Sequence, residues 1–196
     1  MSTLVIIAHP DIQEGDVNQV WKKTLEDRSD LVTVHDLYQT YPDGNIDVEH
    51  EQALLQKHDY IIFQYPMFWM SYPPLLQQWF DEVYTHGFAF DGGDALKGKH
   101  FALAISCGQP KAHYKEDGPI GYTIDEICNP LKGVVNLIGG HFFGIHAIYQ
   151  TDDIDNFATL AENADEYVAF VERLQKKNSN HKHFPLDSLV GSLYYR

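Results

Sequence analysis

The stretch Tyr60-Ile61-Ile62-Phe63-Gln64-Tyr65, closed by Pro66, decides the fold. It is a short and almost wholly apolar run, which is typical of a strand buried on both faces of a parallel sheet. Pro73 and Pro74 follow where a helix can begin, because proline is tolerated in a first helical turn. Apolar side chains then recur at helical spacing towards a stop expected at Gly87, and they are Leu75, Leu76, Trp79, Phe80 and Val83.

This pairing of a strand with a helix repeats along the chain in both directions. Strands are predicted over residues 4–8, 31–37, 60–65, 100–106 and 142–149. Helices are predicted from Val17, over 48–57, from Pro74, over 122–138 with a break allowed at Pro130, and over 153–176, whereas 38–47 has the composition of a loop. The alternation predicts an α/β fold, a three-layer sandwich in which helices cover both faces of a five-stranded parallel sheet.

The size and composition suit one compact domain, since the chain has 196 residues, of which 44% are hydrophobic. We assign residues 1–176 to this domain and the basic, then apolar, residues 177–196 to a C-terminal extension. The formal net charge of −14 disfavours nucleic acid and anionic lipid as partners. No apolar run approaches the roughly 18 residues that a membrane span needs, so membrane insertion is not expected.

The two cysteines, Cys107 and Cys128, are too few for a disulfide framework, and the N-terminus runs straight into an apolar strand without a basic leader. Both features favour a cytoplasmic location. The chain has 11 histidines but no His-Glu-x-x-His motif, and it has no Cys-x-x-Cys motif. No metal site is therefore predicted.

Three irregular loops leave the carboxyl ends of the predicted strands, where ligands bind in sheets of this kind. In the loop after Ala8, backbone N–H groups at the start of the next helix could hold a phosphate with help from His9 and Asn18. An ordinary N-capped loop is the alternative. Neither a Gly-x-Gly-x-x-Gly fingerprint nor a Walker lysine pattern occurs there.

The loops after the third and fourth strands carry groups suited to a flat ring. Large apolar side chains gather in the second loop, from Pro66 to Pro74, and a flavin ring is a natural partner for them, although local core or a subunit contact is the alternative. In the third loop, Gly108 allows close approach of backbone to a ligand, and His113 and Tyr114 can donate hydrogen bonds above a ring. Cys107 is interpreted as a small filler.

With these segments the chain resembles the flavodoxin-like NAD(P)H:quinone oxidoreductases. The resemblance is to the bacterial branch that includes modulators of drug activity, general stress quinone reductases and ancillary flavoproteins of glutathione-gated potassium efflux systems. It is carried by Ala8-His9-Pro10 with Asn18, Pro66-Met67-Phe68-Trp69, Pro73-Pro74-Leu75-Leu76, Trp79-Phe80-Asp81-Glu82-Val83, His86-Gly87-Phe88-Ala89-Phe90 and Leu96-Lys97-Gly98-Lys99.

The resemblance implies a flavodoxin-like fold, FMN or FAD as cofactor, NADH or NADPH as co-substrate, and a homodimer with its active site between the subunits. FMN is favoured over FAD because the chain is shorter than FAD-binding relatives. Tyr114 falls where the family carries a tyrosine near the hydride acceptor. By the same resemblance, the flavin phosphate would meet His9, Gly15, Asp16, Val17 and Asn18, the ring would meet Pro66, Met67, Phe68 and Trp69, and its polar edge would meet Ser106, Cys107, Gly108 and Gln109.

The chain departs from the family pattern at three places. Gly15 replaces the usual serine or threonine, so its backbone N–H would serve in place of a hydroxyl. Ser106-Cys107-Gly108-Gln109 replaces the Thr-Thr-Gly-Gly of many relatives. Ile120 stands where some larger relatives have a histidine, so a relay from Tyr114 would need His113 instead.

The expected function is two-electron, ping-pong hydride transfer from NAD(P)H through the flavin to a quinone or another small aromatic acceptor, such as a nitro- or azo-compound. Two alternatives are kept. One is a regulatory ancillary flavoprotein that binds an efflux channel, and the other is a flavodoxin-type one-electron carrier.

Overall fold

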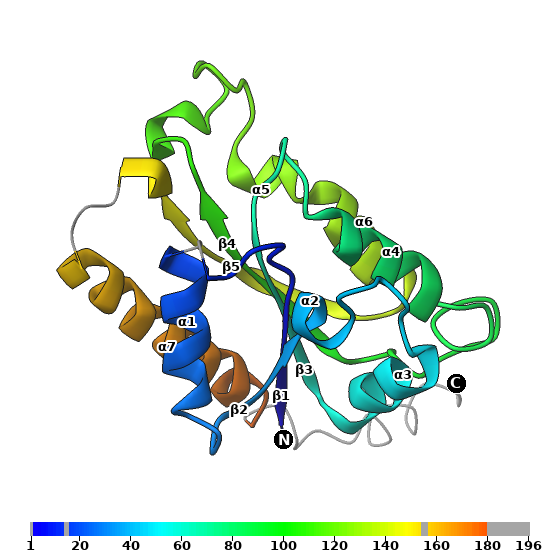
Figure 1. The fold of residues 1–196 in the computed structure, drawn as a ribbon. Coiled ribbons are helices and arrows are strands. Elements are labelled where there is room, and N and C mark those ends of the chain that lie inside the picture. The colour runs from blue at the N-terminus through cyan, green and yellow to red at the C-terminus, as the bar shows by residue number, and fades with distance from the viewer. Residues whose placement is uncertain (1, 14–15, 154–156, 180–196) are drawn as a thin grey trace, which may run out of the picture.

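The structure, a computed structural model, describes residues 2–13, 16–153 and 157–179. In these residues a single sheet has the strand order β2-β1-β3-β4-β5, and all neighbouring strands are parallel (Figure 1). This confirms the predicted five-stranded parallel sheet. The strands are β1 Thr3–Ile7, β2 Val32–Asp36, β3 Tyr60–Pro66, β4 His100–Cys107 and β5 His141–Tyr149.

Helices cover both faces of the sheet and make the predicted three layers (Figure 1). One face carries α1 Asp16–Glu26 and α7 Phe157–Ser179. The other carries α2 Leu37–Thr40, α3 Val48–Lys57, α4 Pro74–Val83, α5 Ile124–Ile127 and α6 Asn129–Leu137. Two 3₁₀ turns, η1 Lys111–His113 and η2 Thr151–Asp153, follow β4 and β5.

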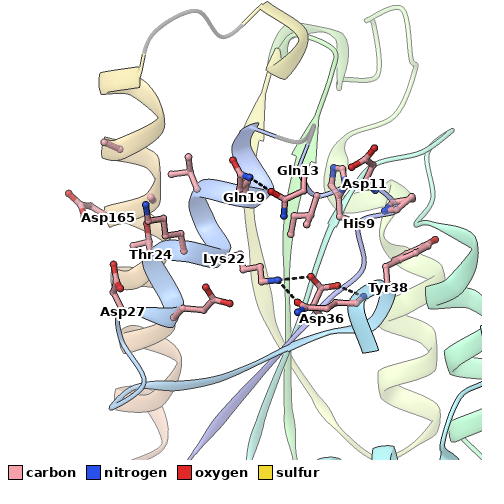
Figure 2. A pocket seen from close by; sticks show the side chains of 18 residues that line it. His9, Asp11, Gln13, Gln19, Lys22, Thr24, Asp27, Asp36, Tyr38 and Asp165 are labelled. Atoms are coloured by element: carbon pink, nitrogen blue, oxygen red, sulfur yellow. Dashed lines mark hydrogen bonds and ion pairs between the residues drawn. The ribbon is translucent and has the colours of Figure 1, made fainter. Parts of the chain in front are cut away.

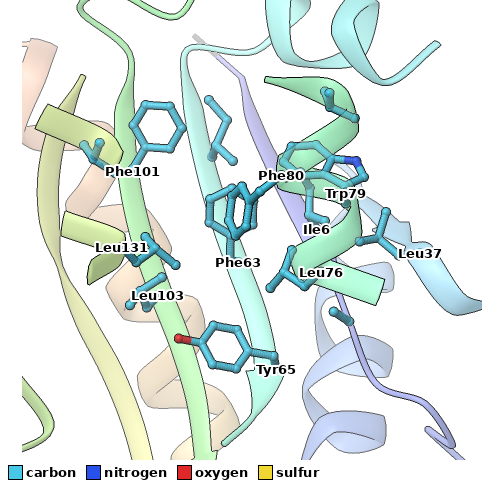
Figure 3. Close-up of a cluster of buried hydrophobic side chains, with 14 of the residues drawn as sticks. Ile6, Leu37, Phe63, Tyr65, Leu76, Trp79, Phe80, Phe101, Leu103 and Leu131 are labelled. Carbon is cyan, nitrogen blue, oxygen red and sulfur yellow. The ribbon is translucent and has the colours of Figure 1, made fainter. Parts of the chain in front are cut away.

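The core consists of two apolar clusters because successive strand residues point to opposite faces of the sheet. Leu4 and Ile6 join the cluster under α4 and α6, whereas Val5 and Ile7 join the cluster under α1 and α7. Phe63 lies at the centre of the first cluster, with its ring 5.0 Å from that of Phe80 (Figure 3). Within the described residues, helices therefore cover both sheet faces, and the loops at the ends of the strands are left to form a site.

Two predictions were wrong between residues 38 and 87, one of a loop and one of the end of a helix. Residues 38–47 are not wholly a loop, because Asp36 accepts a hydrogen bond from the Gln39 N–H at 3.2 Å and starts α2. The helix from Pro74 ends at Val83, well before Gly87, which has a φ of 78° in the loop that follows.

The last two predicted helices also differ from the structure. Residues 122–138 form α5 and α6, which meet at Cys128, and Pro130 lies in the first turn of α6, where its missing N–H costs nothing. The final helix begins at Phe157 and not at Asp153, and it continues to Ser179. Residues 180–196 lie outside the described part of the chain, so the division at 176/177 stays a prediction. No helix among the described residues is long and apolar enough to cross a membrane.

Candidate functional site

The parallel register brings the three predicted loops to one edge of the sheet. Gln64 of β3 pairs with Ile7 of β1 on one side and with Ala104 of β4 on the other. The Ala8 N–H donates to the Gln64 carbonyl at 2.9 Å, and the Met67 N–H donates to the Ser106 carbonyl at 2.8 Å. The segments after β1, β3 and β4 are thus neighbours, although they are far apart in the sequence.

The loop after β1 supplies hydrogen-bond donors for an anion. The half-buried His9 accepts the Asp11 N–H on Nδ1 at 3.2 Å, which leaves the ring proton on Nε2. Burial lowers the pKa of His9, while Asp11 and Asp36 partly oppose this. At the start of α1, the first N–H groups have no partner within the helix, and Val17 is buried there. Gly15 and the side chain of Asp16 lie outside what the structure describes.

Asn18 faces the interior. It is 2% exposed, and its Nδ2 donates to Ser106 Oγ at 2.8 Å. Gln64 Nε2 donates to the Asn18 carbonyl and to its Oδ1, at 3.2 and 3.3 Å. Both ends of the Asn18 amide are therefore engaged inside the protein, and the side chain fastens α1 to β3 and β4. Its predicted contact with a phosphate stays a prediction.

Gln64 is a polar residue beneath this edge that the sequence did not single out as a candidate. It is completely buried, and its Oε1 has no hydrogen-bond partner among the described residues. A buried amide oxygen without a donor is uncommon, and here it leaves an unused hydrogen-bond acceptor beneath the edge of the sheet.

The loop after β3 is a tight hairpin that displays aromatic side chains. The backbones of Phe68 and Ser71 exchange two hydrogen bonds, at 3.0 and 2.9 Å. Trp69 and Met70 between them have φ values of 49° and 62°, which fits a type I′ turn. Such a conformation costs non-glycine residues about 1–2 kcal/mol each. Trp69 is 98% exposed and Phe68 is 41% exposed, whereas Pro66 and Met67 lie against the protein. A strained turn therefore holds a large apolar surface in solvent.

The loop after β4 is tied to the turn after β5. Ser106 and Cys107 are buried, and Gly108 and Gln109 come to the surface. The Gln150 N–H donates to the Gln109 carbonyl at 3.1 Å. The side chain of Gln109 contacts His113, with 3.1 Å between Oε1 and Nδ1. These contacts fix the loop at the same edge as the hairpin.

Tyr114 is only 7% exposed, and its hydroxyl is hydrogen-bonded with the Cys107 thiol. Burial, with the neighbouring Cys107, Tyr149 and Asp152, raises the pKa of Tyr114. Burial likewise raises the pKa of Cys107 to about 12 and that of Cys128 to about 11. The phenol and both thiols are therefore protonated at neutral pH, which agrees with Cys107 as a filler and leaves Tyr114 with a hydroxyl proton to donate.

A groove of about 1100 Å³ runs along α1 and meets this edge at one end (Figure 2). Its lining includes His9, Asp11 and Gln13 near the edge of the sheet, and Thr24 and Asp165 between α1 and α7. Lys22 crosses it and contacts Asp36 Oδ2 at 2.7 Å and Gln39 Oε1 at 2.9 Å. The hairpin and residues 106–109 do not line this groove, so it extends the site and does not contain it. Among the described residues, no cluster of histidine, cysteine, aspartate or glutamate is arranged to hold a metal ion.

Residues 1–171 match the family that is described by its flavodoxin-like fold, and the chain belongs to that family. YdeQ of Bacillus subtilis, named an uncharacterized NAD(P)H oxidoreductase, is 42% identical over 176 residues, which are 89% of this chain and 88% of YdeQ. KefG of Cronobacter sakazakii, named an ancillary protein of a glutathione-regulated potassium-efflux system, is 41% identical over 147 residues, which are 74% of this chain and 79% of KefG.

Two solved structures have the same fold over nearly their whole length. General stress protein 14 of Treponema denticola, in complex with FMN, is 36% identical with a TM-score of 0.84, and the match covers 89% of this chain and 99% of that one. An NADPH-quinone reductase of P. pentosaceus is 30% identical with a TM-score of 0.79, and the match covers 87% and 98%. The resemblance drawn from the sequence is thereby confirmed.

Proposed function

We propose that this protein is an FMN-dependent NAD(P)H:quinone oxidoreductase. One observation carries the proposal: an exposed aromatic hairpin, the start of α1 and the loop at Gly108 meet at one edge of the sheet. Similarity to an FMN-bound protein and to an NADPH-quinone reductase supports it.

The residues at this edge fit the two chemical halves of FMN. The free N–H groups of the first turn of α1 and the Nε2–H of His9 suit its phosphate. The hairpin from Pro66 to Trp69 suits the flat ring, and the backbone from Ser106 to Gln109 suits the polar edge of that ring. FMN, when bound, accepts two electrons with a hydride from NAD(P)H and passes them to a second substrate.

Tyr114 and His113 have separate tasks in this proposal. Tyr114 stays protonated, so it can donate a hydrogen bond to an oxygen that gains electron density. A thiol is a weak acceptor, so the bond to Cys107 is easily exchanged for a bond to a stronger oxygen acceptor. His113 is held at the surface of the loop by Gln109, whose Oε1 accepts from Nδ1, so Nε2 of the neutral ring is left to accept a hydrogen bond from a substrate at this edge.

A homodimer completes the site. Trp69 and Phe68 expose apolar surface beside the edge where the ring would lie. Exposed apolar surface of this kind is typical of a region that a partner covers. We therefore place the second copy of the chain over the hairpin. The compartment that we propose is the cytoplasm.

The test is an anaerobic absorbance spectrum of the protein reconstituted with FMN, before and after NADPH is added, followed by menadione. A flavin band that is retained, bleaches with NADPH and returns with menadione is the expected result. His9→Ala should weaken FMN binding, whereas His86→Ala, whose side chain is 74% exposed, should not. A wild-type protein that holds no FMN, or whose FMN is not reduced by NADPH or NADH, would contradict the proposal.

An ancillary role in potassium efflux is the second candidate, and the similarity to KefG favours it. In that role the same fold would bind a membrane channel and modulate its gating. Co-purification with a channel subunit, together with a change in potassium efflux on addition of the protein, would support it. A protein that turns over NADPH and quinone but leaves efflux unchanged would be an enzyme alone.

A further inference from the structure

Gly108 is closed in by a carboxylate from another loop. A Cβ on this residue would lie 2.7 Å from Asp152 Oδ2 and 3.1 Å from Oδ1, both shorter than van der Waals contact. Both carboxylate oxygens thus face the backbone of Gly108, and no side chain fits there unless Asp152 moves. The sequence suggested that a ligand approaches Gly108 closely, but in this structure Asp152 occupies the space where a Cβ would be.

The position of Asp152 follows from the pairing of β4 with β5. Cys107 and Tyr149 are register partners at the ends of these strands. Gln150 then turns with a φ of 59° and donates its N–H to the Gln109 carbonyl at 3.1 Å. This turn leads directly into η2, which lays Asp152 against Gly108. Strand register and a backbone hydrogen bond therefore set the position of the Asp152 backbone beside the loop at Gly108.

The Asp152 carboxylate is an unneutralised charge within the described part of the chain. The side chain is exposed, and it forms no ion pair or hydrogen bond with a described residue. The nearby cation Lys111 lies over the ring of Tyr149, with Nζ 5.9 Å from its centroid. The side chain of His113 contacts Gln109. A negative charge thus stands beside the loop that would meet the polar edge of the flavin.

We propose that Asp152 sets the electron affinity of the bound flavin by placing a negative charge beside the Ser106–Gln109 loop. The inference rests on the proposed function, since it requires the ring to meet that loop. A flavin that has taken two electrons gains negative charge on its polar edge. A like charge nearby disfavours that form, and for an exposed carboxylate, which solvent screens, we expect a shift in the equilibrium of up to about tenfold. Asp152 therefore promotes onward transfer of electrons to the acceptor.

The experiment measures the two-electron midpoint potential of bound FMN against a reference dye in the wild type, Asp152→Asn and Asp117→Asn. Asp117 is the matched control, because it loses the same charge but is 81% exposed and paired with Lys115 at 3.1 Å. Asp152→Asn should favour the reduced form by up to about tenfold, which is about 30 mV for a two-electron couple. The control should match the wild type.

A second variant tests the position of the Asp152 carboxylate without changing its charge. Gly108→Ala keeps Asp152 but forces its carboxylate away, so its potential should shift in the same direction as that of Asp152→Asn. Potentials for Asp152→Asn and Gly108→Ala that equal the control, in proteins that bind FMN, would overturn this inference alone. Absence of FMN binding by the wild type would overturn the proposed function and this inference with it.

Discussion

Replacement of Glu51 should be the most damaging single change away from the candidate site. This glutamate of α3 is completely buried. Its Oε1 accepts from His35 Nε2 at 2.7 Å and from the Tyr41 hydroxyl at 2.6 Å, and its Oε2 accepts from Trp79 Nε1 at 2.8 Å. One carboxylate thus joins β2, α3 and α4 in the interior.

The expected loss follows from the groups left behind. Glu51→Ala leaves three buried donors, those of His35, Tyr41 and Trp79, without their acceptor. Removal of one partner from a buried ion pair costs about 3–5 kcal/mol. Glu51→Gln retains one oxygen for His35 and Tyr41 but turns an NH₂ group towards the Trp79 N–H, so about 1–3 kcal/mol is expected. The whole protein is stable by only about 5–15 kcal/mol, so the loss for alanine is a large fraction.

The same network makes stability depend on pH. Burial raises the pKa of Glu51, but hydrogen bonds from His35, Tyr41 and Trp79 outweigh burial and leave the pKa below its usual value. A lowered pKa in the folded state means that the stabilisation is present above the unfolded value of about 4.3 and is lost as the pH falls through the folded value. The difference in the free energy of unfolding between the wild type and Glu51→Gln should therefore become smaller below about pH 4.

Urea unfolding followed by circular dichroism, at pH 7 and at several values below pH 5, measures these differences. Glu49→Gln is the control, because Glu49 lies on the same helix and is exposed. The reasoning is refuted if Glu51→Ala loses no more stability than Glu49→Gln at pH 7.

Three further predictions concern the edge of the sheet. Asn18→Ala leaves Ser106 Oγ and Gln64 Nε2 without their partner, so it should cost about 1–3 kcal/mol and weaken FMN binding in a fluorescence titration; unchanged unfolding would show that the amide does not fasten α1. Trp69 has a φ of 49°, which glycine adopts more easily than tryptophan. Trp69→Gly should therefore leave the stability in urea unfolding unchanged or raise it by up to about 1 kcal/mol, with poorer FMN binding. A clear loss of stability would mean that the turn is not strained. Cys107 and Cys128, with pKa values raised to about 12 and about 11, should react with a disulfide reagent at pH 8 only after unfolding; rapid labelling of the folded protein would contradict their burial.

The fold was largely predictable because its signals are local. The apolar runs at 4–8 and 60–65 are strands, since their composition suits burial on both faces. The errors concerned the ends of helices, which are set by local capping interactions that hydrophobic periodicity does not reveal. Asp36 capped a helix within a predicted loop, and Cys128 ended one helix and started the next. Boundaries of this kind depend on single hydrogen bonds.

The site was predictable only as a set of loops. Parallel strands put their carboxyl ends at one edge, so the convergence of the segments after Ala8, Tyr65 and Ser106 followed from the strand pattern. The direction of each side chain did not. Asn18 has the polarity of a ligand contact, yet it points inward, because Gln64 and Ser106 offer it partners there.

The sequence by itself determined the α/β class, the parallel sheet and the edge at which a ligand would bind, because hydrophobic periodicity and turn residues act over a few positions. The tertiary structure alone decided that Glu51 is buried among three donors, that Trp69 stands in solvent on a strained turn, and that Asp152 faces Gly108. Each of these depends on residues that are distant in sequence and meet only through strand register and packing. Such contacts produce no periodic pattern in the sequence.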